Sequence, residues 1–152
     1  MDKFGAQRAN TMMERMIALG QREGINFSFG GKTGNTRDSH RLIQLAEEKD
    51  LETQGKVVEE LFKAYFEKEE DITSLDVLQA AGERAGLDGK ELKMWLAGDK
   101  GGKQVDQKVL QAQSSYIGGV PSFTVQGEYQ LEGAQDPQEF VEIFQKIKAA
   151  EI

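Results

Sequence analysis

The chain has 152 residues and a formal net charge of −7, with 30% charged and 38% hydrophobic residues. This length fits one domain, or one domain with a small appendage, and the acidic balance argues against binding to a phosphate backbone or an anionic membrane. The sequence contains no cysteine, which excludes disulfides, thiolate zinc sites and cysteine nucleophiles within it. Because it shows neither a bilayer-length apolar run nor a signal-peptide core, we expect a cytoplasmic protein without nucleic-acid or membrane partners.

Helical periodicity dominates residues 6–117. A first helix is expected over 6–23, with Gly24 as its stop. We interpret Met12, Met13 and Met16 as its core-facing side, the alternative being an adaptable binding surface. The alternation in 25–29 indicates either a strand or an extended linker, and the glycine-rich segment 30–34 is interpreted as a flexible hinge. Further helices are expected from Asn35 or Thr36 to about Lys49, from Thr53, from Ser74 to about Gly86, from Asp88, and from Val105 to about Tyr116.

The pattern changes to strand, strand and helix in the last part of the chain. Residues 122–125 and 128–131 predict a hairpin around Gln126-Gly127. The last helix begins with Asp136 as N-cap, Pro137 and Glu139, a capping-box arrangement. Its expected inward face consists of Phe140, Val141, Phe144 and Ile147. We therefore predict a mostly α-helical α/β fold, with a helical domain over 6–117 and a smaller domain over 118–152.

Val120-Pro121 stands at the start of the first strand of this hairpin, after Gly118-Gly119. Proline cannot donate to a sheet ladder, so it fits the first residue of a strand. Only bonds that precede proline adopt the cis form at small cost. We therefore predict a cis bond here, the alternative being a trans proline at a strand start.

A proline loop followed by strand, strand and helix resembles the C-terminal half of a thioredoxin fold, and the helical block before it resembles the insertion of the DsbA-like family. The detailed resemblance is to its FrnE-like branch, which is related to 2-hydroxychromene-2-carboxylate isomerases and kappa-class glutathione transferases. It is carried by Lys3–Gly5, Gly24–Phe27, Asn35–Thr36, His40–Ile43, Leu61–Phe66, Asp71–Ile72, Leu75, Val77–Leu78, Gly118–Phe123 and Leu131–Gln135. In that family an N-terminal β-α-β half carries Cys-x-x-Cys in the oxidoreductases, or a serine in the isomerases and transferases. That half has no counterpart in this sequence, so the resemblance assigns no catalytic residue.

The resemblance also implies a binding site. Gly119, Val120 and Pro121 would offer a backbone edge to a substrate peptide or to glutathione, the one cofactor that the resemblance suggests. The segment equivalent to Gly133, Ala134 and Gln135 holds the γ-glutamyl end in glutathione-binding relatives. We favour a plain capped loop there, because Asp136 and Glu139 already satisfy the donors of the helix start.

Asn35 and His40, the single histidine, would have a supporting role near the substrate cleft, although a lone histidine on a helix is more often structural. One histidine and no cysteine predict no metal site.

Two hypotheses of function follow. The first is a DsbA/FrnE-like thiol–disulfide oxidoreductase, or its glutathione-dependent isomerase relative with a small thiol or aromatic substrate, represented without the catalytic segment and so inactive in thiol chemistry. The second is a non-catalytic module that binds a peptide or assembles with a partner. A lone two-stranded hairpin is marginally stable and would leave one edge and one apolar face uncovered. We therefore expect a homo-oligomer, formed as a dimer or by strand exchange, with residues 25–29 available as a replacement strand.

Overall fold

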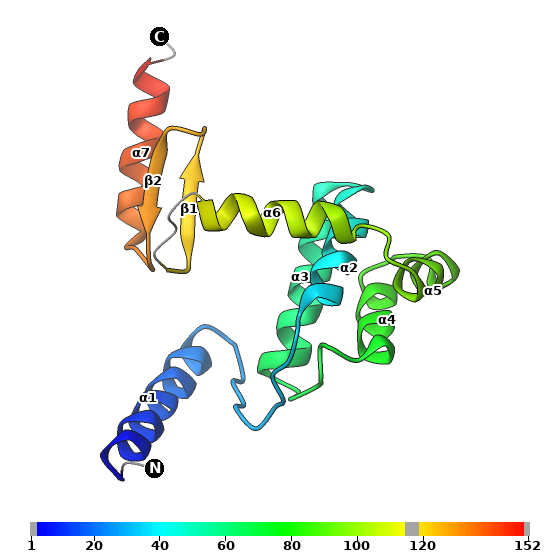
Figure 1. The fold of residues 1–152 in the computed structure, drawn as a ribbon. Helices are drawn as coiled ribbons and strands as arrows, with labels where there is room; N and C mark the ends of the chain where they lie inside the picture. Colours follow the sequence, from blue (N-terminus) through cyan, green and yellow to red (C-terminus); the bar gives the residue numbers. More distant parts are fainter. Residues whose placement is uncertain (1–2, 115–118, 151–152) are drawn as a thin grey trace. The chain divides into compact units, whose positions relative to one another are not determined.

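The computed structural model describes residues 3–114 and 119–150, which fall into two compact units divided between Asp106 and Gln107. The first unit holds α1 (Lys3–Arg22), α2 (Arg37–Glu47), α3 (Leu51–Phe66), α4 (Leu75–Arg84), α5 (Gly89–Ala97) and the start of α6 (Gly102–Ser114) (Figure 1). The second unit holds the rest of α6, β1 (Ser122–Val125), β2 (Tyr129–Glu132) and α7 (Pro137–Ala150). The domain boundary expected at 117/118 lies outside the described residues and stays a prediction.

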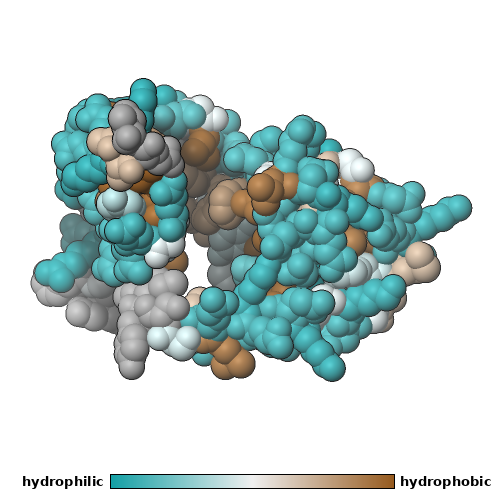
Figure 2. All heavy atoms as spheres, turned by 90° about the horizontal axis from the view of Figure 1, so that it is seen from above, coloured by the Kyte–Doolittle hydropathy of each residue, from teal (hydrophilic) through white to brown (hydrophobic). Residues whose placement is uncertain are grey.

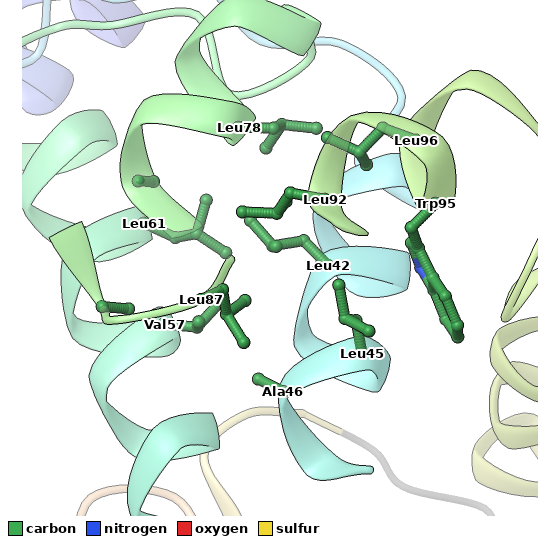
Figure 3. Packing of buried hydrophobic residues seen from close by; sticks show 12 residues of the cluster. Leu42, Leu45, Ala46, Val57, Leu61, Leu78, Leu87, Leu92, Trp95 and Leu96 are labelled. Carbon is green, nitrogen blue, oxygen red and sulfur yellow. The ribbon is translucent and has the colours of Figure 1, made fainter. Parts of the chain in front are cut away.

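The core of the first unit is built by α2, α3, α4 and α5. Helix α2 packs against the other three, and α4 packs against α3 and α5. Apolar side chains on one face of each helix, most of the large ones leucines, point toward one another in the middle of this bundle (Figure 3). Its largest fully buried side chains are Leu42, Leu45, Leu78, Leu92 and Val57. Each such burial stabilises the fold by roughly 1.5–3 kcal/mol, so these side chains hold the helices in place.

Side-chain caps set several helix starts. Asp88 accepts hydrogen bonds from the N–H groups of Lys90 and Glu91 at 3.1 and 2.9 Å, so the predicted start of α5 is confirmed. Helix α3 starts earlier than expected, because Asp50 rather than Thr53 is its N-cap and accepts from the Thr53 N–H at 2.7 Å.

Helix α1 exposes the methionines that were expected to face the core. Met12 is 65% and Met16 40% exposed, whereas Met13 and Ile17 are half-buried and Gly20 is buried. The expectation was wrong for Met12 and Met16 because α1 is partly buried on the adjacent face, which carries Met13, Ile17 and Gly20. An added Cβ on Gly20, for example, would lie 2.4 Å from the Phe27 ring.

The segment after α1 forms neither helix nor strand and joins no sheet in the described part of the chain. Its backbone is anchored where Ser28 N–H donates to the Phe66 carbonyl oxygen at 2.7 Å. The Phe27 ring meets Phe66 edge-on at 5.8 Å and stacks with Phe29 at 5.9 Å. The linker interpretation of 25–29 is therefore the correct one, and its alternation reflects aromatic packing on α3.

The second unit is a hairpin covered on one face by α7 (Figure 1). Strands β1 and β2 run antiparallel, with Ser122 opposite Glu132 and Val125 opposite Tyr129. The turn residues Gln126 and Gly127 have φ of 52° and 73°, and a type I′ turn requires such positive values at both central positions.

The second face of the hairpin is polar. The residues on it, Ser122, Thr124, Gln130 and Glu132, are all exposed. The uncovered apolar face that the sequence suggested is therefore absent from the described strands, and only the strand edges lack a partner there. Hydrophilic side chains also cover most of the surface drawn in Figure 2, with hydrophobic ones in small patches.

Helix α7 begins where it was predicted, but its buried face is rotated. Asp136 caps it by accepting from the Gln138 N–H at 2.9 Å. Ile143 is the buried residue, and Phe140 and Ile147 are half-buried. Val141 and Phe144, both expected inward, are exposed, because the hairpin contacts the face centred on Ile143.

Candidate functional site

The segment Gly119–Pro121 leads directly into β1 and is open to solvent. The peptide bond between Val120 and Pro121 is cis. The Val120 side chain is 89% exposed, and a Cβ added to Gly119 would meet nothing within 4 Å. The Pro121 carbonyl oxygen accepts a hydrogen bond from the Gly133 N–H at 2.8 Å, which ties the loop to the end of β2. The structure thus brings together Gly119, Val120, Pro121 and Gly133.

Strand β1 has a free edge within the described two-stranded sheet. Hydrogen-bonded and non-hydrogen-bonded pairs alternate in an antiparallel ladder. Since Pro121 and Gly133 form a bonded pair, Phe123 and Leu131 form the next, and the backbone groups of Ser122 and Thr124 point away from β2. Such an edge is a template for an added extended chain.

Residues Gly133, Ala134 and Gln135 form the connection from β2 to α7. Gly133 has a φ of 78°, which favours glycine, and Gln135 Nε2 donates to the Glu132 carbonyl oxygen at 2.5 Å. The first turn of α7 is capped from within by Asp136. A negative carboxylate therefore already occupies the helix start, and a ligand-binding role for these residues stays a prediction.

An apolar pocket of about 340 Å³ lies in the first unit. The aromatic side chains Phe62, Tyr65 and Phe66 of α3 form one part of its lining, together with aliphatic residues of α2 and α3 and with Ile72. Its few polar contributors are Lys32, Thr33, Thr36, Ser39 and His40, and its lining contains no carboxylate. Sequence reasoning missed this pocket, because Val58, Leu61, Tyr65 and Phe66 fall at the spacing of an ordinary core face.

Asn35 and His40 lie five residues apart on the chain and have different surroundings. Asn35 Oδ1 accepts from the Arg37 N–H at 2.9 Å and so caps α2, whereas Thr36 makes no side-chain cap. His40 is exposed and belongs to the lining of the pocket. Of the two predicted supporting residues, His40 is thus the one in contact with a cavity.

The segment that leads into residues 32–34, one wall of the pocket, is held by Glu69. This carboxylate accepts from Ser28 Oγ and, at 2.8 Å, from the Gly30 N–H, and these hydrogen bonds lower the pKa of Glu69. A Cβ on Gly30 would lie 2.6 Å from Glu69, and one on Gly34 would lie 2.8 Å from Thr73. The glycines thus permit close packing onto the turn after α3, and the segment interpreted as a hinge is fixed by these contacts.

The described residues contain no cluster of three or more His, Asp or Glu side chains able to hold a metal ion. Within the same residues, no helix combines the length and the apolar character needed to cross a membrane.

Comparison with known proteins identifies the fold. The sequence profile of the DSBA-like thioredoxin domain family matches residues 3–145. A crystal structure of a probable DsbA oxidoreductase from Streptomyces coelicolor is similar, with a TM-score of 0.83 and 24% sequence identity. The similarity covers 92% of this chain but only 60% of that one, and no curated protein sequence matches.

The mostly helical architecture with its small sheet is therefore a DsbA-like thioredoxin fold with a helical insertion, the fold of thiol oxidoreductases. Neither comparison distinguishes the FrnE-like branch, which stays a prediction. From the match over nearly its whole length, the chain belongs to the DSBA-like thioredoxin domain family.

Proposed function

We propose that this chain binds an extended peptide substrate of a DsbA-type thiol–disulfide reaction, through Gly119–Pro121 and the free edge of β1. The observation that carries the proposal is an exposed loop that continues directly into a strand edge with no partner among the described residues. Because the sequence contains no cysteine, the chain would contribute substrate binding, and the reacting thiols would be supplied from outside it. Within this proposal we place the chain in the FrnE-like branch and in the cytoplasm.

The edge would recognise backbone rather than sequence. An added strand would bond to the outward N–H and C=O groups of Ser122 and Thr124 and to the backbone of Val120. Each such hydrogen bond contributes only about 0.5–1.5 kcal/mol net, so a strand this short would bind weakly and tolerate many sequences. Weak and tolerant binding suits a protein that handles many unfolded substrates.

Backbone amide NMR during a peptide titration tests the proposal. The probe is a cysteine-free peptide of alternating valine and threonine, and its control is the same peptide with alternate amides N-methylated. We expect shifts confined to residues around 119–124 with the first peptide and none with the second. Equal binding of both peptides, or shifts located on α2 and α3 instead, would reject the edge as the binding surface.

A matched pair of variants sharpens this test. Thr124→Pro removes one outward N–H from the edge without removing a bond to β2. Thr124→Val keeps that N–H and the β-branched shape. We expect the proline variant to weaken peptide binding and the valine variant to retain it, with the hairpin shifts of both showing that the strands still pair.

The pocket beside His40 supports a second candidate, binding of a small aromatic or glutathione-like substrate as in the isomerase and transferase relatives. Its volume of about 340 Å³ suits a small ligand, and Lys32 and His40 supply polar groups to an otherwise apolar lining. Titration with 1-naphthoate and with glutathione would test it, with Phe62→Ala as the variant expected to lose the response. Naphthoate binding without any peptide response at β1 would favour this candidate over the first.

The same free edge supports a third candidate, a non-catalytic assembly module in which two copies pair through β1. Sedimentation velocity over a hundredfold range of concentration would reveal the dimer. Loss of that dimer in Thr124→Pro would assign the edge to self-association. A monomer at every concentration would reject self-association and favour peptide binding at this edge.

A further inference from the structure

Helix α1 carries a row of exposed apolar side chains that its own unit does not use. We call it the α1 seam, formed by Ala9, Met12, Met16 and Leu19. Met12, Met16 and Leu19 are 65%, 40% and 52% exposed. Their spacing alternates between three and four residues, which lines up a narrow stripe for one facing helix. Because α1 packs through Met13, Ile17 and Gly20 instead, the seam stays open.

A row of arginines runs along one flank of the seam. Arg8, Arg15 and Arg22 recur every seven residues and are all exposed. None of them forms an ion pair or a side-chain hydrogen bond within the described residues. No Asp or Glu stands three or four positions from any of them, so the helix does not neutralise them either. In a chain of net charge −7, an aligned and unpaired cationic row marks a surface complementary to an anion.

We infer that this face of α1 docks an amphipathic helix of a partner protein whose flank carries acidic side chains. The stripe supplies the apolar contact, and the arginine row supplies the charge complementarity that selects the partner. A helix packed at the shallow angle of coiled coils would follow the stripe and keep its carboxylates beside the arginines.

The apolar surface extends beyond the end of the seam. Met16 also lines, with Ile25, Phe29 and Phe62, a mostly apolar groove of about 470 Å³, whose charged lining residues are Lys63, Glu59 and Glu67. This groove would receive a bulky side chain from the end of the partner helix. Exposed apolar patches rimmed by polar groups mark protein-interaction surfaces, and this one is continuous from α1 to α3.

Other occupants fit the charges less well. Two copies of α1 packed antiparallel would bring one arginine row against the other, and packed parallel they would place arginines beside Met13 and Gly20. A membrane surface would meet a chain of net negative charge and a stripe that is narrow for an interfacial helix.

Fluorescence anisotropy with labelled synthetic helices tests the inference on the full chain. One peptide of about three heptads carries leucine at its seam positions and glutamate on both flanks, and its control carries lysine in place of glutamate. We expect the glutamate peptide to bind about tenfold more tightly, with an advantage that shrinks as salt rises. The variant R8E/R15E/R22E should reverse the preference while keeping its circular dichroism spectrum.

A second pair of variants tests the apolar residues of the α1 seam. Met12→Ser with Met16→Ser should abolish binding, whereas Met94→Ser, at an equally exposed methionine of α5, should leave it intact. Equal affinity for both peptides, or no binding of either, would overturn the inference. So would self-association that the Met12/Met16 variant removes, or sedimentation of the chain with phosphatidylserine vesicles in preference to the peptide.

Discussion

Arg41 and Trp95 hydrogen-bond to each other's main chain. Arg41 Nη2 donates to the Trp95 carbonyl oxygen at 2.7 Å, and Trp95 Nε1 donates to the Arg41 carbonyl oxygen at 3.0 Å. The Arg41 residue is only 3% exposed, and its other N–H groups reach Lys100 and Asp38. The guanidinium thus caps carbonyls left unpaired at the C-terminal end of α5, where the helix dipole favours a cation.

Replacing Arg41 with Met should lower the free energy of unfolding by about 3 kcal/mol, because several buried acceptors lose their donor at once. Urea unfolding followed by the fluorescence of Trp95, the single tryptophan, measures the change. Arg8→Met, at an exposed arginine of α1, is the control and should stay within about 0.5 kcal/mol of the parent. If Arg41→Met were equally harmless, Arg41 would not be the group that fastens α5 to α2.

Gly101→Ala should also destabilise the first unit. Gly101 has a φ of 74°, and an added Cβ would lie 2.6 Å from Trp95 Cζ2. Backbone strain and the clash together should cost about 1–3 kcal/mol. Gly55→Ala is the matched control, since Gly55 lies within α3 with nothing within 4 Å of an added Cβ, and it should stabilise by about 0.5–1 kcal/mol. Equal effects of the two substitutions in urea unfolding would show that the position of Gly101 is not special.

The pH dependence of stability should reflect the ion pair between Arg37 and Asp106. Arg37 Nε and Nη2 donate to the two carboxylate oxygens of Asp106 at 2.8 and 3.0 Å, and these bonds lower the pKa of Asp106 below its usual 3.8. A lowered folded-state pKa means that this stabilisation is present above the unfolded value and is lost as pH falls through the folded one.

Asp106→Asn should therefore be less stable than the parent near neutral pH, and the difference should shrink below about pH 3.8. Urea unfolding of both proteins across this range measures it. In an Arg37→Met background the Asp106→Asn substitution should have little effect, which completes a double-mutant cycle. A pH-independent difference would mean that Asp106 acts through packing and not through its charge.

Local signals made much of the fold predictable. Asp88 caps α5 and Asp136 caps α7 as the sequence indicated, because a cap depends on neighbours two or three residues away. The hairpin around Gln126-Gly127 followed from the turn residues alone, and the position of Pro121 placed the candidate loop at its start.

Features that depend on packing between distant parts of the chain could not be predicted from the sequence. The apolar pocket is lined both by residues 32–43 and by residues 58–72, and its 32–34 part follows a segment that Gly30 ties to the distant Glu69. No local sequence pattern indicates contacts between residues so far apart. The favoured core-facing interpretation of Met12 and Met16 in α1 was wrong for a related reason. Two adjacent stripes of a helix can be equally apolar, and the segment that packs against the helix decides which of the two stripes is buried.

Glu69 should control the order of the segment that forms one wall of the pocket. It holds a φ of 57°, where glycine would be less strained, yet its carboxylate is the acceptor for Gly30 and Ser28. Glu69→Gly should therefore accelerate amide exchange at Gly30 even though the backbone becomes freer of strain. Glu69→Gln keeps one acceptor oxygen, so its amide exchange rate at Gly30 should lie between those of the parent and of Glu69→Gly. Unchanged exchange in the glycine variant would assign the order of this segment to the aromatic contacts of Phe27 alone.

The two phenylalanines of α7 should differ sharply. The ring of Phe140 meets that of Phe123 edge-on at 5.0 Å, whereas Phe144 is 55% exposed. Phe140→Ala removes an aromatic contact between α7 and β1 and should cost the second unit about 2 kcal/mol, while Phe144→Ala should stay within about 0.5 kcal/mol. Hydrogen exchange at the Gly133 amide, which bonds to the Pro121 carbonyl oxygen, reports the opening of the hairpin. Faster exchange in Phe144→Ala than in Phe140→Ala would mean that α7 packs on the hairpin through the side that carries Val141 and Phe144.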